Sequence, residues 1–305
     1  DARQATFAIQ VALDRAGFST GVIDGRMGSN TRRAIDAYRQ RHRAEPSPFP
    51  DPLLEYRITA EDEAGPFVSE IPTDLVEQSK LPALAYRSIV EALAERFHTT
   101  PEVLRELNAS ASFTAGANIR VPNVEPLVVL TTLATPAPAK ADSNGAAAQA
   151  VGTSVRPPAL DKAQKNDKPD VIVRVSRSAG SLTATDIDGK ALFFAPVTTG
   201  SRNDPLPIGE WKVNGVQNNP TFNYNPDLFW DADPGHTKAT IPPGPNGPVG
   251  LVWIDISKEH YGLHGSPEPS KIGRTESHGC VRLTNWDALR VAALVKPGTR
   301  VVFVE

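Results

Sequence analysis

Near its C-terminus the chain reads Ser277-His278-Gly279-Cys280-Val281-Arg282-Leu283-Thr284-Asn285, and His264-Gly265 precedes this stretch. Cys280 is the only cysteine among 305 residues, so it cannot close a disulfide within the chain. A cysteine thiolate is a nucleophile, a nearby histidine can accept its proton, and adjacent backbone N–H groups can hold an oxyanion. The stretch therefore predicts covalent catalysis by Cys280.

The order of residues, a histidine followed at a distance by Ser/Thr-His-Gly-Cys-x-Arg-x-x-Asn, resembles the signature of the L,D-transpeptidase (YkuD-type) catalytic domain. Thr199-Gly200, Leu206–Trp211 and Ile241–Gly250 also match stretches of such domains, so the resemblance covers residues 170–305. It implies a mostly-β catalytic domain, a YkuD-like β-sandwich with one capping helix. Period-two patterns and turn residues predict its elements: strands at Val171–Val175, Leu182–Thr185, Leu192–Phe194, Val249–Ile256 and Thr299–Val304, and a helix at Trp286–Val295.

The resemblance implies that Cys280 is the nucleophile and that His264 is the base. Because Gly265 has no side chain, a backbone carbonyl must orient the imidazole of His264. His278 would shape the cysteine loop. Gly279 would allow the turn that directs the N–H groups of Gly279 and Cys280 at the substrate carbonyl. We expect the pKa of the thiol to lie below its ordinary value of about 8.5.

Four further residues are expected to line the substrate site. The guanidinium of Arg282 has the fork shape that suits a peptide carboxylate. Ser277 and Asn285 are expected to act as hydrogen-bonding braces, and Tyr224 to stack against a substrate stem.

Length and composition limit the number of domains and the kinds of partner that the chain can have. A chain of 305 residues predicts two or three domains. The net charge of −3 argues against nucleic acid as the main partner. No apolar run approaches the roughly 18 residues of a transmembrane segment. The chain opens at Asp1 without a signal peptide, so we expect an exported protein of the periplasm or cell envelope whose leader is absent.

Residues 1–45 predict a small all-α domain. Apolar spacing predicts one helix that ends at Gly17 and a second at Thr31–Arg41, with Ser29 or Asn30 as its cap. Gly17–Ile35 resembles a peptidoglycan-binding domain of the PG_binding_1 kind. A helical appendage without a ligand is the alternative.

Residues 52–125 predict a small α+β unit, in which Ile89–Pro122 is similar to a LysM repeat. The opening strand usual for LysM is missing there and is replaced by Leu81–Tyr86, so a glycan-binding repeat and a spacer both remain open. Residues 126–169 are rich in Ala and Pro and predict a flexible linker. Because the predicted catalytic residues all follow this linker, we expect residues 1–165 to be dispensable for turnover of small muropeptides.

The function implied is a cysteine-dependent peptidoglycan L,D-transpeptidase that needs no metal or organic cofactor. Cys280 would take the acyl group of a tetrapeptide stem, D-Ala would leave, and an amine would accept the acyl group. The amine could belong to another stem, giving a 3-3 cross-link, or to a wall-anchored lipoprotein. Transfer to water would make the protein an L,D-carboxypeptidase. A zinc enzyme using His264, His278 and Cys280, and a non-catalytic cell-wall-binding protein, are further alternatives.

Overall fold

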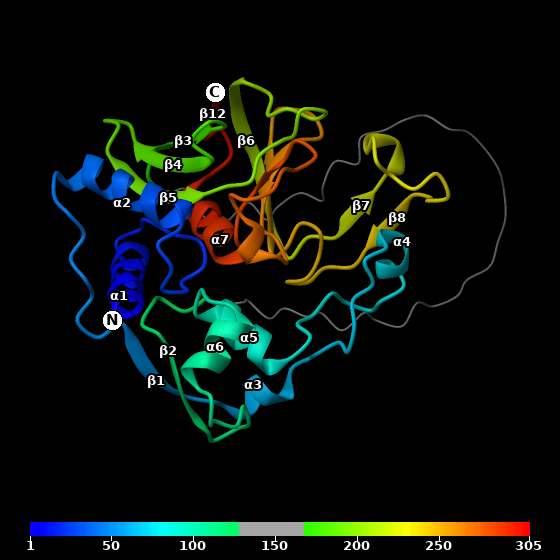
Figure 1. Ribbon diagram of the computed structural model, residues 1–305. Helices are drawn as coiled ribbons and strands as arrows, with labels where there is room; N and C mark the ends of the chain where they lie inside the picture. The colour runs from blue at the N-terminus through cyan, green and yellow to red at the C-terminus, as the bar shows by residue number, and fades with distance from the viewer. Residues whose placement is uncertain (128–167) are drawn as a thin grey trace, which may run out of the picture. The chain divides into compact units, whose positions relative to one another are not determined.

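The computed structural model describes residues 1–127 and 168–305 (Figure 1). The predicted linker at 126–169 lies almost entirely outside these residues. Asp1–Val128 and Lys168–Glu305 belong to one compact unit, so the described parts share contacts throughout. No helix among the described residues is both long and apolar enough to cross a bilayer.

The C-terminal part is built on one mixed eight-stranded sheet in the order β11-β10-β9-β6-β12-β3-β4-β5. The first half of β6 pairs with β12 and its second half pairs with β9, with a register shift between Val213 and Gly215. After β5 the chain returns to the far edge through bridges from Thr198 to Arg282 and from Gly200 to Ser277. The expected β-sandwich is therefore corrected to one continuous sheet that curls on itself. Its strands are β3 (Val171–Ser176), β4 (Ser181–Asp186), β5 (Ala191–Pro196), β6 (Gly209–Asn218), β9 (Val252–Ile256), β10 (Gly262–His264), β11 (Val281–Arg282) and β12 (Arg300–Val304).

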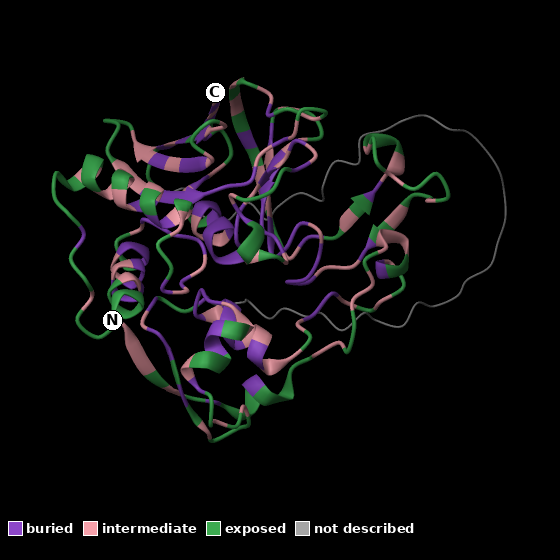
Figure 2. Ribbon diagram, viewed as in Figure 1, coloured by how far each residue is buried: buried purple, intermediate pink, exposed green. Residues whose placement is uncertain are grey.

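One α-helix of this part, α7 (Asn285–Leu294), covers the sheet and is mostly buried (Figure 2). The Thr284 hydroxyl caps it by accepting from the Asp287 N–H. Ala288 and Val291 pack into the same core as the inner residues of the strands. The strand predicted at Val249–Ile256 begins only at Val252, because Gly250 takes a positive φ of 61° that ends a turn.

A two-stranded hairpin projects from the sheet and consists of β7 (Phe222–Tyr224), the 3₁₀ turn η1 (Pro226–Leu228) and β8 (Ala239–Ile241). A second 3₁₀ turn, η2 (Pro269–Lys271), precedes the cysteine loop. The hairpin packs on α4 (Leu75–Gln78) through an apolar cluster that includes Leu84, Tyr224 and Ile241. The N-terminal part of the chain therefore supports this hairpin.

The N-terminal helices are α1 (Ala2–Arg15) and α2 (Ser29–His42). The second helix starts at Ser29, with Gly28 at the N-cap and no side-chain cap, so the predicted capping by Ser29 or Asn30 is wrong. The amide of Asn30 instead donates to the Ile272 carbonyl at 2.9 Å. It therefore joins α2 to the C-terminal part.

The next segment contains β1 (Leu53–Arg57), α3 (Ala60–Ala64), α5 (Ile89–Arg96), α6 (Pro101–Leu107) and β2 (Asn118–Pro122). The opening strand that the sequence seemed to lack is β1, which pairs antiparallel with β2. It lies far upstream of α5 because residues 58–88 are inserted between them. Phe7, Val11 and Ile23 share one core with this segment, whereas Phe18 and Ala34 pack against Phe194 of β5 in a separate cluster.

A buried polar interface joins the N-terminal part to α7. The Asp14 carboxylate accepts two hydrogen bonds from the Arg290 guanidinium, at 2.8 and 3.0 Å. The Ser19 hydroxyl donates to Asp287 at 2.8 Å, and the His98 ring stacks on Trp286 at 5.1 Å. Because these groups are buried, the expectation that residues 1–165 are dispensable is not supported.

Candidate active site

The predicted base and nucleophile lie on neighbouring strands. In the parallel pair of β10 and β11, Leu263 is opposite Val281 and His264 is opposite Arg282. The Leu283 N–H donates to the His264 carbonyl at 2.9 Å and fixes this register. Cys280 immediately precedes β11, so the sheet brings it beside the strand that carries His264.

The imidazole of His264 is held in one tautomer. Its Nδ1 lies 2.7 Å from the Gly265 carbonyl oxygen, which can only accept, so Nδ1 carries the proton. The ring also stacks on Trp253 with centroids 5.5 Å apart. Burial and the positive charge of Arg282 lower the pKa of His264 to about 3, against the opposing effect of the Gly265 hydrogen bond. The ring is therefore neutral, and Nε2 carries a lone pair that can accept a proton.

The Cys280 thiol is half-buried and lies 3.7 Å from the His260 carbonyl oxygen, to which it donates. Burial raises the pKa of the thiol above its ordinary value, although the Gly262 N–H and the charge of Arg282 act in the opposite direction. The predicted fall in this pKa is therefore wrong, because a neutral imidazole contributes no charge that would stabilise a thiolate. The resting pair is a neutral thiol and a neutral imidazole.

The cysteine loop depends on glycine. Gly279 has a φ of 101°, and a Cβ at this position would lie 2.6 Å from the Tyr261 ring. The Ser277 hydroxyl donates to the Cys280 carbonyl at 2.6 Å and closes the loop. Within residues 1–127 and 168–305, the N–H groups of Gly279 and Cys280 donate to no protein acceptor. Both groups are thus available to an oxyanion, and Ser277 has the contacts of a brace.

Arg282 supplies a cation next to the thiol. Its Nε is buried and has no hydrogen-bond partner among the described residues. An unpaired buried N–H of a guanidinium is costly, and a carboxylate is the ligand that would satisfy it best. The Arg282 Nε is therefore a donor close to Cys280 without a protein partner in the described part of the chain.

His278 faces the hairpin. Its Nε2 lies 2.8 Å from an Asp231 carboxylate oxygen, and its ring contacts Phe229 edge-on with centroids 5.2 Å apart. Trp230 lies next to the same imidazole and is 62% exposed. His278 therefore links the cysteine loop to the tip of the hairpin, a link that no local sequence pattern indicated.

Residues 170–303, which contain all of these groups, match the family model of the YkuD L,D-transpeptidase catalytic domain. This part of the chain is similar to L,D-transpeptidase catalytic domains. YkuD of Bacillus subtilis is 30% identical over 129 residues, which make up 42% of this chain and 63% of that protein. YbiS of Escherichia coli is 33% identical over 115 residues, covering 36% of this chain and 37% of that protein.

Among solved structures, L,D-transpeptidase 3 of Mycobacterium tuberculosis with a faropenem-derived adduct is similar at 21% identity and a TM-score of 0.37. The match covers 45% of this chain and 61% of that one. The chain thus spans less than two thirds of each of these relatives. Residues 1–127 lie outside the region that the family model matches.

Tyr224 and Asn285, which were predicted to contact substrate and to brace the site, have buried positions. Tyr224 is 3% exposed and bonds to His236 Nδ1 through its hydroxyl at 2.9 Å. Its predicted stacking against a substrate is corrected, because the ring has no free face. His236 in turn bonds to Asp74 at 2.9 Å and ties the hairpin to the cap of α4. Asn285 is fully buried, and its contacts are those of a brace.

Sequence reasoning missed the partner of Asn285. Its Nδ2 donates to a Glu95 carboxyl oxygen at 2.6 Å and to the Pro245 carbonyl at 3.1 Å, while its Oδ1 accepts from the Leu251 N–H at 3.0 Å. Glu95 lies on α5, far outside the catalytic domain. Its position in an amphipathic helix gave no signal of a contact with the active-site motif.

The zinc alternative lacks a ligand set in the described part of the chain, where no group of three His, Cys, Asp or Glu side chains converges. His278 instead pairs with Asp231, and His264 uses Nδ1 to contact Gly265. The two histidines of the motif are therefore committed to different partners.

Proposed function

We propose that the chain is a peptidoglycan L,D-transpeptidase of the cell envelope that forms an acyl-enzyme on Cys280. The observation that carries this proposal is the grouping of a neutral imidazole, a thiol and the unpaired Arg282 guanidinium on adjacent strands. The match of residues 170–303 to the catalytic domain family supports the same reaction class.

In the first half-reaction the thiol turns from the His260 carbonyl, and its proton passes to Nε2 of His264. The Sγ atom attacks the carbonyl carbon at the third residue of a tetrapeptide stem, and the C–S bond forms. The N–H groups of Gly279 and Cys280 hold the oxyanion. The C–N bond to D-Ala then breaks, and the imidazolium returns the proton to the leaving amine.

In the second half-reaction an amine of another stem attacks the thioester. His264 accepts the proton of the amine, the C–S bond breaks, and the thiolate regains a proton from the imidazolium. The new amide bond is the cross-link. If water takes the place of the amine, the same site performs carboxypeptidase chemistry, and a lipoprotein amine would give protein anchoring.

Arg282 is assigned to the carboxylate of the stem. Its buried Nε has no other partner in the described residues, and the guanidinium can bind a carboxylate with two hydrogen bonds. Arg282→Lys should therefore raise KM more than it lowers kcat, because a lysine ammonium group cannot form the bidentate hydrogen bonds of a guanidinium.

The proposal is tested by intact-protein mass spectrometry with a carbapenem and with tetrapeptide muropeptides. We expect one covalent adduct in the wild type and none in Cys280→Ala. With muropeptides we expect D-Ala release and a dimer whose mass equals two tetrapeptides minus one D-Ala. An adduct that persists in Cys280→Ala would exclude Cys280 as the nucleophile. Accumulation of tripeptide monomer without dimer, at any acceptor concentration, would identify a carboxypeptidase.

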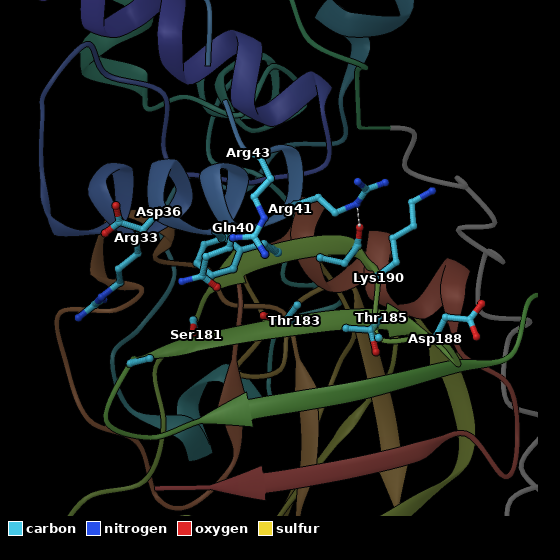
Figure 3. Close-up of a pocket in the computed structure, with 15 residues that line it drawn as sticks. Arg33, Asp36, Gln40, Arg41, Arg43, Ser181, Thr183, Thr185, Asp188 and Lys190 are labelled. Atoms are coloured by element: carbon cyan, nitrogen blue, oxygen red, sulfur yellow. Dashed lines mark hydrogen bonds between the residues drawn. The ribbon is translucent and has the colours of Figure 1, made fainter. Parts of the chain in front are cut away.

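We further propose that the N-terminal part binds the wall through a groove between α2 and the sheet (Figure 3). The groove has a volume of about 750 Å³. Cationic groups line one side, and the hydroxyls of β4 form its floor. Its polar lining residues are Arg33, Asp36, Gln40, Arg41, Arg43, Ser181, Thr183, Thr185, Asp188 and Lys190.

The charges of this groove favour an acidic glycopeptide. Asp36 is already paired with Arg39 at 3.0 Å, whereas Arg41 and Arg43 pair with no carboxylate of residues 1–127 and 168–305. Arg174 of β3 is opposite Thr183 and adds a further cation on the same face of the sheet. Stem-peptide carboxylates and sugar hydroxyls complement such a lining.

Pelleting with purified sacculi tests the groove. The variant Arg43→Glu/Lys190→Glu should bind fewer sacculi and show weaker salt dependence than the wild type, because two attractive charges become repulsive. Arg32→Glu is the matched control, since Arg32 is exposed on the same helix and does not line the groove. Equal retention of the double variant and the wild type would exclude the groove as the wall contact.

A further inference from the structure

The side-chain amide of Asn285 uses both of its N–H donors and its oxygen in hydrogen bonds. The Leu251 N–H requires an acceptor and the Pro245 carbonyl requires a donor, so the orientation of the amide is fixed. This orientation leaves one N–H, and Glu95 of α5 accepts it at 2.6 Å. Because all of these groups are buried, the loss of one partner would leave an unsatisfied polar atom.

The side chain of Asn285 also packs against Gly265, whose backbone carbonyl orients His264. A Cβ at Gly265 would lie 2.0 Å from Asn285 Oδ1, and a Cβ at Gly250 would lie 2.0 Å from the same atom. Gly250 and Gly265 are therefore pressed against this oxygen, and neither position can hold a larger residue. The Gly265 carbonyl accepts the Nδ1 proton of His264. The position of Asn285 thus determines where this carbonyl lies.

We propose that Glu95, supplied by the N-terminal part of the chain, is a positioning residue for the base, acting on His264 through Asn285 and the Gly265 carbonyl. This inference rests on the proposed function, in which His264 transfers the proton. It means that the catalytic motif is completed by a residue that lies outside the matched catalytic domain.

The helix that carries Glu95 is held firmly enough for this role. The Ser88 hydroxyl caps α5 by accepting from the Glu91 N–H. Leu93 and Ala94 are fully buried in the core that α5 shares with α1. Two flanking contacts also tie this segment to the catalytic part: the His98 ring stacks on Trp286, and the Asn246 amide donates to the Ala85 carbonyl at 2.9 Å. Glu95 is therefore held in a fixed position next to Asn285.

The chemistry of Glu95 suggests a conservative variant that keeps the contact. Burial raises the pKa of Glu95 to about 8, with the Asn285 hydrogen bond acting in the opposite direction, so the carboxyl is largely neutral near pH 7. Glutamine has the shape of a neutral glutamic acid and keeps the acceptor oxygen. Glu95→Gln should therefore preserve the contact, whereas Glu95→Ala removes it.

The test uses the full chain and steady-state release of D-Ala from a tetrapeptide muropeptide. Glu95→Ala should lower kcat by about 10- to 100-fold, because a catalytic group displaced by a fraction of an ångström to 1 Å loses activity on this scale. KM should change less than about twofold, because the Arg282 clamp is untouched. Glu95→Gln should retain most of the wild-type kcat. Glu91→Ala is the matched control, because Glu91 lies one turn earlier on α5, is 12% exposed and pairs with Arg87 instead of with Asn285.

A double-mutant cycle separates positioning from general loss of stability. If Glu95 acts through Asn285, then Glu95→Ala should cost little further kcat in an Asn285→Ala background. Additive losses, or a Glu95→Ala enzyme with the wild-type kcat, would overturn the inference. A wild-type chain that releases no D-Ala would instead refute the proposed function, so the two failures are distinguishable. Circular dichroism of Glu95→Gln, expected to match the wild type, excludes unfolding as the cause of any loss in that variant.

Discussion

At the scale of single residues, the site holds its two reactive groups in uncharged forms. Burial raises the pKa of the Cys280 thiol, while burial and Arg282 lower the pKa of His264 to about 3. A thiolate–imidazolium pair would need both shifts in the opposite directions. Proton transfer therefore belongs to the attack step, when the substrate oxyanion appears in the loop, and not to the resting enzyme.

This arrangement predicts the pH dependence of thiol alkylation. Iodoacetamide reacts with the thiolate, so its rate should rise with pH and level off only above the ordinary thiol pKa of about 8.5, because the pKa of Cys280 is raised. Mass spectrometry of the adduct against time, from pH 6 to pH 10, measures this profile. A rate that is already constant between pH 6 and pH 8 would show that the resting thiol is ionised.

The two histidines of the motif should respond differently to substitution. His264→Gln should lower kcat by about 10²- to 10⁴-fold, because it removes the base at Nε2. His278→Gln should cost less, because the His278 ring contacts Asp231 and Phe229 of the hairpin. The kcat values for D-Ala release compare the two variants. A larger loss in His278→Gln than in His264→Gln would reverse the assignment of the base.

At the scale of helices and strands, the sequence predicted those features whose residues lie close together in the chain. The residues from Ser277 to Asn285 are consecutive, so motif and loop could be predicted together. The strand β1 pairs with β2 across an insertion of residues 58–88, so no short window contains both strands. The contact between Glu95 and Asn285 spans 190 positions. Such a pair of buried polar groups has no periodic pattern that would reveal it.

The hairpin of β7 and β8 carries the most exposed aromatic side chain near the site, Trp230, at 62% exposure. Its ring lies beside His278 without being buried in a core. An exposed indole at this position can cover a bound stem and exclude water. Trp230→Ala should therefore raise KM several-fold and leave the thermal midpoint unchanged. Ile187→Ala is a control, since Ile187 is 72% exposed on the other end of the sheet. A KM equal to that of the wild type would exclude a substrate contact by Trp230.

At the scale of the whole molecule, residues 1–127 and 168–305 are joined by buried charged groups. Burial alone would raise the pKa of Asp14, but His98 and Arg290 hold it well below its usual value. Burial raises the pKa of Asp287 to about 7, and its carboxyl accepts from Ser19. Arg290 and Asp287 would each lose a partner if residues 1–127 were removed. The contacts with residues 1–127 therefore help to stabilise α7.

Residues 1–127 should be required for the stability of residues 168–305. Deletion of residues 1–127 removes the partners of Arg290 and Asp287 and uncovers the apolar rings of Phe194 and Trp286. A domain has only about 5–15 kcal/mol of stability to offset such losses. The fragment 168–305 should thus be unfolded or markedly less stable than the full chain, and it should not form the carbapenem adduct.

Asp14→Asn in the full chain isolates one contribution and should lower the thermal midpoint. Asp36→Asn, at an exposed position on α2, should leave the thermal midpoint unchanged. Circular dichroism melts and intact-mass acylation measure both effects. A fragment that melts and acylates like the full chain would show that the buried contacts of Asp14, Ser19 and Glu95 contribute nothing to the catalytic fold, because all three would then be replaceable by water.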